Sequence, residues 1–420
     1  MPPGFHWVIV AQFVSALADN ALLIVTIALL AAQGLPVWWA PLLKLGFTLS
    51  YVVLAPVVGA LADAVPKGRL MAWMNAIKGL ACLLLLLDLH PVLAFTLAGL
   101  GAAGYAPAKY GLITELVPAR LLVRANGWIE VSVVCAALLG AGLGGYLVSH
   151  HWLDSGLSEA WQALATDWAL PTAATQPLGL SVAALVILYV VAGVLNGPIP
   201  ASHARYPASA IHPVALCREF WRANLCLWRD ADGGRLSLSV TTLFWGVGAT
   251  LQFIVLQWAQ DLLGLSLSQA AYLQAAVAIG VVAGAVAAGR YIALERARHM
   301  LFAGVVLGLM IVVLAQVRTL PVALVLLLVT GAMGGLMVVP LNALLQHRGY
   351  VLLSAGRSVA VQGFNENASV LLMVALYAAL TGAELPVQHI MWFLGGAIAL
   401  AIGLLWWRDT RPHQAPRPAA

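Results

Sequence analysis

Long apolar stretches, separated by short polar segments, repeat along the whole chain. Each stretch is long enough for a helix rising about 1.5 Å per residue to cross a hydrocarbon core about 30 Å thick. The pattern predicts twelve transmembrane helices. Their approximate ranges are residues 7–31, 40–62, 70–88, 91–114, 122–148, 178–197, 236–262, 268–291, 299–316, 320–345, 358–380 and 386–407.

The composition excludes a soluble globular protein. Hydrophobic residues make up 62% of the 420 residues and charged residues only 9%, whereas soluble domains carry about 25% charged residues. Because lipid offers the backbone no hydrogen-bond partners, apolar segments of this length form helices. We therefore expect an all-α polytopic membrane protein.

The basic residues are divided unequally between the two sides of the predicted membrane domain. Of the 21 Lys and Arg residues, 17 fall in the termini and loops of one side, and only Arg318 falls in a loop of the other. The positive-inside rule places the basic side and both termini in the cytoplasm. The net charge of +5 suits contact with anionic membrane lipids and not with nucleic acid.

A long basic segment divides the twelve spans into two groups of six. We expect an N-terminal six-helix bundle over 1–197, a cytoplasmic linker over 198–235, a C-terminal six-helix bundle over 236–407 and a tail over 408–420. In the linker, the apolar residues Trp221, Leu225 and Trp228 recur at helical spacing. This spacing predicts a short amphipathic helix lying on the inner leaflet. Two six-span halves with weakly repeated features are typical of a secondary transporter with a site near the midplane.

Asp19 lies in the middle of the first apolar span and is the most informative residue of the chain. A carboxylate at that depth costs about 2.5–3.5 kcal/mol on insertion scales, so such residues usually face a cavity or a charged partner. Gln12, Ser15 and Asp19 share one helical face. We interpret Asp19 as a substrate-binding residue, with a structural ion pair to Lys109 as the alternative.

Further polar positions mark the spans expected to surround a central cavity. Gln362, Asn365 and Glu366 form one stripe in the eleventh span, and Lys109 follows Tyr105 by one helical turn in the fourth. Glu130 is interpreted as structural, paired with Lys78 or a loop arginine. The candidate substrate-binding residues are Gln12, Asp19, Asn20, Tyr105, Lys109, Gln252, Asn342, Gln362, Asn365 and Glu366.

The mixed charge of these candidates narrows the substrate class. A carboxylate suits an ammonium group and a lysine suits a phosphate, so the set favours a zwitterion or a cation-coupled substrate. Buried carboxylates can also bind Na⁺ or H⁺, and coupling to either ion is left open. We expect no cofactor and no metal site, because the four cysteines form no C-x-x-C pair.

The loop after the second span carries a recognisable pattern, in which Asp63 is followed by Lys67, Gly68 and Arg69. It resembles the loop signature of the major facilitator superfamily, with one extra residue before Lys67. Asp63 could cap a helix N-terminus, and the basic residues could bind carboxylates across the interface between the halves. The candidate residues of this conformational latch are Asp63, Lys67, Arg69, Arg124 and Glu130.

Several longer sequence segments resemble those of one family within that superfamily. They are Val10 to Leu23, Gly104 to Gly111, Leu243 to Gly246, Val338 to Gln346 and Ala360 to Asn367. Together they are similar to the bacterial lysophospholipid transporters, over about residues 8–407. The resemblance implies the major facilitator fold, and polar-site roles for Asp19, Lys109 and Glu366. The chain departs from the family at Gln252, where an arginine would be expected.

The same resemblance implies a function. Lysophospholipid, chiefly lysophosphatidylethanolamine, would be flipped from the outer to the inner leaflet of a bacterial inner membrane. A cytoplasmic-face acyltransferase/acyl-carrier-protein synthetase would then reacylate it.

Two alternatives remain open at this point. The first is a proton-coupled exporter of amphiphilic drugs, which would share the fold and the midplane acids. The second is a membrane enzyme or assembly factor of lipid metabolism, which is disfavoured because the sequence shows no acyltransferase-like His-Asp cluster, and His90, His150 and His151 lie in or next to outer loops without ordered acidic partners. The chain contains no G-x-x-x-x-G-K-[S/T] motif, so transport driven by ATP binding to this chain is not expected.

Overall fold

The computed structural model describes all residues except 37–38, 203, 207–211 and 411–420. The described part is helical and contains no β-strand. Its helices are α1 Phe5–Ala32, α2 Trp39–Ala64, α3 Lys67–Leu86, α4 Pro91–Leu116, α5 Leu122–Leu147, α6 His150–Leu153, α7 Gly156–Asp167, α8 Thr172–Thr175, α9 Leu178–Val194, α10 Pro213–Arg229, α11 Gly234–Leu263, α12 Leu267–Tyr291, α13 Leu301–Leu314, α14 Leu320–Leu352, α15 Ala355–Gly382 and α16 Val387–Thr410.

The predicted number of spans agrees with these helices. Within the described residues, 11 helices are long and apolar enough to cross a membrane. Helix α9 is a shorter apolar helix and supplies the twelfth. The expected all-α polytopic class is therefore confirmed, and α6, α7, α8 and α10 are the helices that lie in connections.

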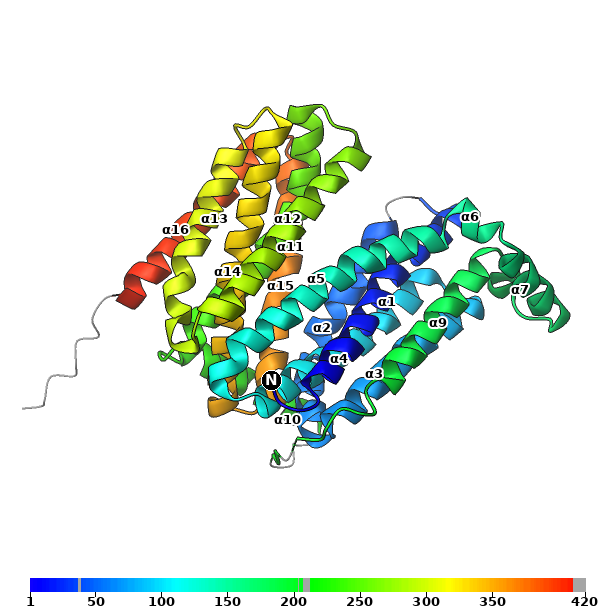
Figure 1. Ribbon diagram of the computed structural model, residues 1–420, viewed down its shortest axis with the longest axis horizontal. Coiled ribbons are helices and arrows are strands. Elements are labelled where there is room, and N and C mark those ends of the chain that lie inside the picture. Colours follow the sequence, from blue (N-terminus) through cyan, green and yellow to red (C-terminus); the bar gives the residue numbers. More distant parts are fainter. Residues whose placement is uncertain (37–38, 203, 207–211, 411–420) are drawn as a thin grey trace, which may run out of the picture.

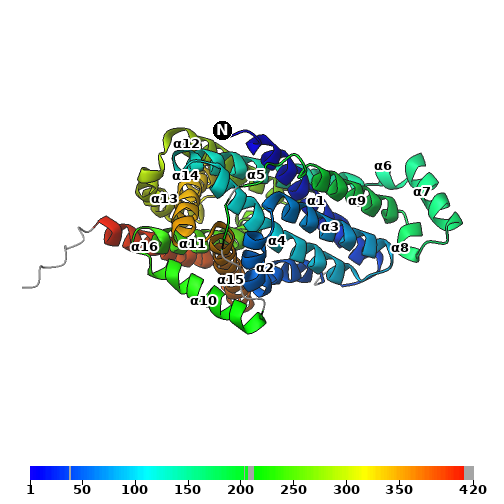
Figure 2. The same cartoon turned by 90° about the horizontal axis from the view of Figure 1, so that it is seen from below.

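The spanning helices form two bundles, α1–α5 with α9 and α11–α16 (Figure 1). The ribbons of the two bundles approach each other at the end where the N-terminus lies, and they diverge toward the end that carries α6 and α7. Seen from below, α2 runs beside α15 and α5 beside α12 and α14 (Figure 2). We call the end with the N-terminus and the Arg-rich loops the basic face, and the other end the opposite face.

Hydrogen bonds join the halves at the basic face. Asp63, near the end of α2, accepts a bond of 2.9 Å from the backbone amide of Gly356 and another from the hydroxyl of Ser354. The carboxylate thus caps the N-terminus of α15, where the helix dipole favours negative charge. Asn126 of α5 and Gln346 of α14 exchange two amide hydrogen bonds of 2.9 Å.

The other predicted latch residues behave differently from Asp63. Lys67 forms an ion pair of 2.6 Å with Glu115, which belongs to the same half, so the expected bond from Lys67 across the interface is not present. Arg69 and Arg124 are exposed. A residue not anticipated from the sequence takes the bridging role: the Tyr206 hydroxyl donates to Glu115 at 2.6 Å and accepts from the backbone amide of Ala355 at 3.4 Å.

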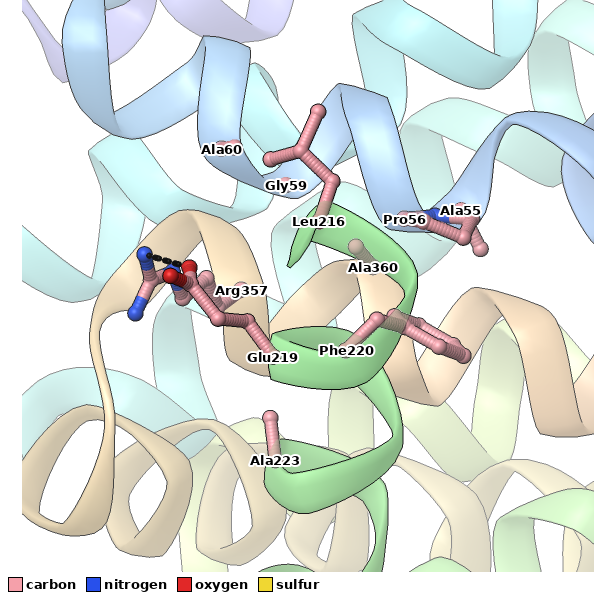
Figure 3. A pocket seen from close by; sticks show the side chains of 10 residues that line it. All are labelled: Ala55, Pro56, Gly59, Ala60, Leu216, Glu219, Phe220, Ala223, Arg357 and Ala360. Carbon is pink, nitrogen blue, oxygen red and sulfur yellow. Dashed lines mark hydrogen bonds and ion pairs between the residues drawn. The ribbon is translucent and has the colours of Figure 1, made fainter. Parts of the chain in front are cut away.

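The linker contains the predicted amphipathic helix, α10, but a different face of it meets the protein. Phe220, Ala223 and Leu227 are buried against α2, α11 and α15, whereas Trp221 is 51% exposed. Glu219 of α10 forms an ion pair of 2.9 Å with Arg357 of α15, at the edge of a small pocket between α10, α2 and α15 (Figure 3). The linker helix α10 therefore packs across the contact between α2 and α15.

Small residues set the close packing of α12 against α14. A Cβ atom added at Gly284 would collide with the carbonyl oxygen of Ala332, and one added at Gly331 would collide with the carbonyl oxygen of Val277. Small residues allow membrane helices to approach this closely.

We expect Gly284→Val to destabilise the C-terminal bundle by about 1–3 kcal/mol, the usual cost of overpacking. Gly396→Val is the matched control, because no atom lies within 4 Å of a Cβ added at Gly396. Thermal unfolding in detergent measures both variants. A Gly284→Val protein as stable as the control would contradict the importance of this contact.

Candidate functional site

Asp19 lies halfway along α1 and is held by two neighbouring helices. Lys78 Nζ of α3 contacts Asp19 Oδ2 at 2.7 Å, and the Tyr189 hydroxyl of α9 donates to Asp19 Oδ1 at 2.8 Å. The side chain of Lys78 is 1% exposed and that of Asp19 is 20% exposed. The ion pair is therefore buried on its lysine side and open on its carboxylate side. The partner of Asp19 is Lys78, and not Lys109 as the sequence suggested.

Lys78 and its surroundings form a polar network inside the N-terminal half. Lys78 Nζ donates to Ser15 Oγ at 3.1 Å, and Ser15 Oγ donates to Asn75 Oδ1 at 2.7 Å. The ammonium also lies 5.1 Å from the centroid of the Tyr105 ring, a favourable cation–π distance. Sequence reasoning did not place Asn75, Lys78 or Tyr189 in the site. The sequence does contain a signal that could have identified two of them, because Asn75 and Lys78 are polar residues about one helical turn apart within an apolar span.

Lys109 anchors a second polar group, nearer the basic face. Its ammonium donates to Gln12 Oε1 at 3.1 Å, and the Gln12 amide donates to Ser132 Oγ at 2.9 Å. Glu130 of α5 is buried and interacts electrostatically with Lys109. Glu130 interacts electrostatically with Lys109 without forming an ion pair, and it forms no ion pair with Lys78 or with an arginine in the described part of the chain, the two partners considered from the sequence.

Members of both polar groups, among them Asp19, Lys78 and Lys109, line a cavity of about 330 Å³. Its walls come entirely from helices α1–α5 and contain one acid, Asp19, and three cations, Lys44, Lys78 and Lys109. The expected convergence of spans from both halves is therefore not seen in the lining. The remaining lining residues are Gln12, Ser15, Ala16, Asn20, Leu23, Phe47, Tyr51, Phe95, Ala102, Tyr105, Ala106 and Val133.

The C-terminal half contributes a separate polar cluster. The Gln362 amide donates to Asn342 Oδ1 at 3.0 Å and to Glu366 Oε1 at 2.8 Å. These three predicted residues lie together, but they do not line the cavity around Asp19. Among the residues that the structure describes, no group of three His, Cys, Asp or Glu side chains could hold a metal ion.

Asn365 is turned away from that cluster, in contrast to the single stripe predicted for the eleventh span. Its amide donates to Asn224 Oδ1 at 2.8 Å, and its carbonyl oxygen accepts from the Trp228 indole at 3.1 Å. Both partners belong to α10. Asn365 therefore fastens the linker helix to α15, which is a structural role that its sequence position did not reveal.

Two ionisable groups outside the spans stabilise the basic face. Burial opposes ionisation of Asp230, but hydrogen bonds from Arg348 and the Gly234 amide outweigh it and hold the pKa of Asp230 below its usual value. Burial, together with the Glu115 carboxylate, raises the pKa of Tyr206 well above its usual value. Tyr206 thus remains a hydrogen-bond donor to Glu115 throughout the physiological pH range.

We expect Lys78→Met to lower stability by about 3–5 kcal/mol, because it leaves the Asp19 carboxylate without its cationic partner. The double variant Asp19→Asn/Lys78→Met should be more stable than Lys78→Met alone, since it removes the unpaired charge. Thermal unfolding of the single and double variants measures this coupling. Additive losses would show that the ion pair is not energetically coupled.

We expect Asn365→Ala to loosen α10 while leaving substrate affinity unchanged, because the Asn365 amide bonds only to α10 and to its own helix. Trypsin cleavage at Arg218 or Arg222 should become faster. Gln362→Ala is the comparison, since Gln362 holds Asn342 and Glu366 instead. A change of substrate affinity in Asn365→Ala with unaltered proteolysis would contradict this assignment.

Comparison with known proteins agrees with this architecture. The family model of the Major Facilitator Superfamily matches residues 8–351. A protein named Lysophospholipid transporter LplT from Shigella boydii serotype 4 (strain Sb227) is 40% identical over 404 residues, covering 96% of this chain and 95% of the relative. The protein of the same name from Escherichia coli (strain K12 / DH10B) is 39% identical over 404 residues, with the same coverage.

Solved structures share the fold at low sequence identity. The human organic anion transporter MFSD10 superposes with a TM-score of 0.70 at 14% identity, covering 96% of this chain and 100% of that one. The transporter FucP in the outward conformation gives a TM-score of 0.70 at 14% identity, covering 97% of this chain and 98% of that one. The chain is thus a multi-pass membrane transporter and not an enzyme, and it belongs to the Major Facilitator Superfamily, in the family of the LplT relatives.

Proposed function

We propose that this protein is a secondary transporter that flips lysophospholipids, chiefly lysophosphatidylethanolamine, from the outer to the inner leaflet of the bacterial inner membrane. The substrate class is supported by relatives about 40% identical over nearly the whole chain, which are named lysophospholipid transporters. The observation that carries the proposal is the cavity halfway along the first bundle, where one carboxylate and three ammonium groups lie close together.

The chemistry of the cavity suits a zwitterionic headgroup. Asp19 is the acidic member and exposes part of its carboxylate, so it can attract an ammonium group. Lys109 is bound to a neutral amide oxygen on its cavity side, so it can exchange that bond for a phosphate oxygen. Charge-assisted bonds of this kind are about twice as strong as neutral ones.

The arrangement of the bundles suits alternating access. The positive-inside rule makes the basic face cytoplasmic, together with both termini. The bonds of Asp63, Asn126 and Tyr206 close the contact between the halves at that face, while the bundles diverge at the opposite face (Figure 1). In this interpretation the site is loaded from the outer side, and transport requires those bonds to break.

We further propose a coupling residue and a fate for the product. Glu366 is a partly buried acid without an ion-pair partner in the described part of the chain, so it is our candidate for coupling to H⁺ or Na⁺. A lysophospholipid delivered to the inner leaflet is a substrate for an acyl-transfer reaction. A cytoplasmic-face acyltransferase/acyl-carrier-protein synthetase would supply that step.

In proteoliposomes, we expect inward movement of labelled lysophosphatidylethanolamine to be abolished in Asp19→Asn, because the neutral amide cannot attract the ammonium group. Asp167→Asn is the matched control, since Asp167 is an exposed carboxylate in α7, outside the cavity. Imposed Na⁺ and proton gradients identify the coupling ion. Wild-type rates in a folded Asp19→Asn protein would remove Asp19 from the site.

The same assay distinguishes the proposed lysophospholipid transport from the main alternative, drug export. A proton-coupled exporter would extrude amphiphilic drugs outward and leave the lysophospholipid in its original leaflet. That result would overturn the proposed function.

A further inference from the structure

Lys44 lies in the second turn of α2, near the opposite face, and reaches across to the other half. Its ammonium donates to Gln252 Oε1 of α11 at 3.1 Å and lies 5.9 Å from the centroid of the Phe253 ring. The cross-half bonds of Asp63, Asn126 and Tyr206 lie at the basic face. The Lys44–Gln252 bond therefore crosses between the halves where the bundles have begun to diverge.

Lys44 differs from the other lysines in its partners. The chain has four lysines. Lys67 and Lys78 form ion pairs with Glu115 and Asp19, and Lys109 interacts electrostatically with the buried Glu130 while its ammonium binds the Gln12 amide oxygen. Neither Lys44 nor Lys109 has a carboxylate oxygen within 4.0 Å in the described part of the chain, but Lys109 still interacts electrostatically with Glu130, whereas no acid acts on Lys44 in this way. Its hydrogen-bond partner is the neutral amide oxygen of Gln252, which cannot compensate its charge.

The partner amide is itself held in place. Gln252 Nε2 donates to Gln274 Oε1 at 3.1 Å, and Gln274 Nε2 donates to the backbone oxygen of Gln252 at 3.0 Å. These two bonds fix the Gln252 amide with its oxygen directed at Lys44. The ammonium is thus oriented without being neutralised, which leaves it free to bind an anion.

Lys44 also belongs to the cavity that contains Asp19. It lines the same space as Asp19, Lys78 and Lys109. The charge of Lys78 is balanced by its ion pair with Asp19, and that of Lys109 is offset in part by Glu130, with which it forms no ion pair. Lys44 therefore gives the cavity a positive charge that no carboxylate in the described part of the chain offsets. Lysine binds phosphate oxygens as a compact point charge.

We propose that Lys44, oriented by Gln252, is an entrance site for the phosphate group of the transported lipid. A phosphate oxygen takes the place of the Gln252 carbonyl oxygen on the ammonium, while Asp19 lies deeper in the same cavity to receive the cationic part of the headgroup. The inference rests on the proposed function. It makes recognition of a phosphate, and not only of an acyl chain, a property of this cavity.

The test compares Lys44→Gln, Lys44→Arg and wild type in the lysophosphatidylethanolamine assay. We expect Lys44→Gln to raise KM about tenfold with little change in kcat, which corresponds to the loss of one charge-assisted bond. Lys44→Arg should retain most of the affinity. Arg318→Gln is the matched control, because it removes an exposed charge of the opposite face that does not line the cavity.

A binding measurement tests the Lys44 phosphate site independently of the proposed transport function. Equilibrium binding to the purified protein in detergent is followed by tryptophan fluorescence, with lysophosphatidylethanolamine and with a monoacylglycerol that has the same chain and lacks the phosphate. Lys44→Gln should weaken binding of the first about tenfold and leave the second unchanged.

Equal binding of lysophosphatidylethanolamine by wild type and Lys44→Gln would overturn the Lys44 site, whether or not transport is observed. Equal weakening for both probes would overturn it as well, since it would indicate a structural role. Failure of the wild type to move any lysophospholipid would overturn the proposed function alone, because the binding comparison would still decide the role of Lys44.

Discussion

The ion pair between Asp19 and Lys78 is the constraint on which the rest of the N-terminal half depends. Both charges lie far from either face, and each would be costly in lipid without the other. The pair and the Tyr189 hydroxyl fix the rotation of α1, α3 and α9 relative to one another. Both carboxylate oxygens are bonded, but the side chain of Asp19 remains 20% exposed and lines the cavity. One residue thus joins three helices and gives the cavity its acidic group.

The two halves repeat a fold without repeating its chemistry. The first half concentrates the mixed charges of the cavity, whereas the second presents the neutral amides of Asn342 and Gln362 around Glu366. A headgroup bound at Asp19 would therefore move with the first bundle, and the second bundle would act as the wall that opens and closes. Lys44 and Gln252 form one contact between the two halves near the opposite face.

The sequence predicted the fold well because the signals for it are local. Apolar length alone identified the spanning helices, and the position of Asp63 before a basic loop indicated its capping role. Partner choice depended on how helices rotate against one another, which a single helix does not encode. Asp19 could have met either Lys78 or Lys109, and a turn of about 100° per residue separates Asn365 from Glu366 on the same helix. The face of α10 that packs on the protein was not predicted for the same reason, since Phe220 adjoins Trp221 in sequence but is buried against the protein.

The contact at the basic face is held by bonds that are weak enough to be reversible. Asn126 and Gln346 exchange neutral amide bonds, and Tyr206 meets a backbone amide of α15. Such bonds contribute about 0.5–1.5 kcal/mol each, and the bonds that the Asp63 carboxylate accepts from the other half contribute about 1.5–3 kcal/mol each. The ion pairs of this region join Lys67 to Glu115 within one half and Arg357 to the linker, so neither ties one bundle directly to the other. A closure built this way sums to several kcal/mol, which is comparable to the differential binding energy that shifts a two-state equilibrium. A rearrangement between the two bundles at this face would therefore break hydrogen bonds and leave these two ion pairs intact.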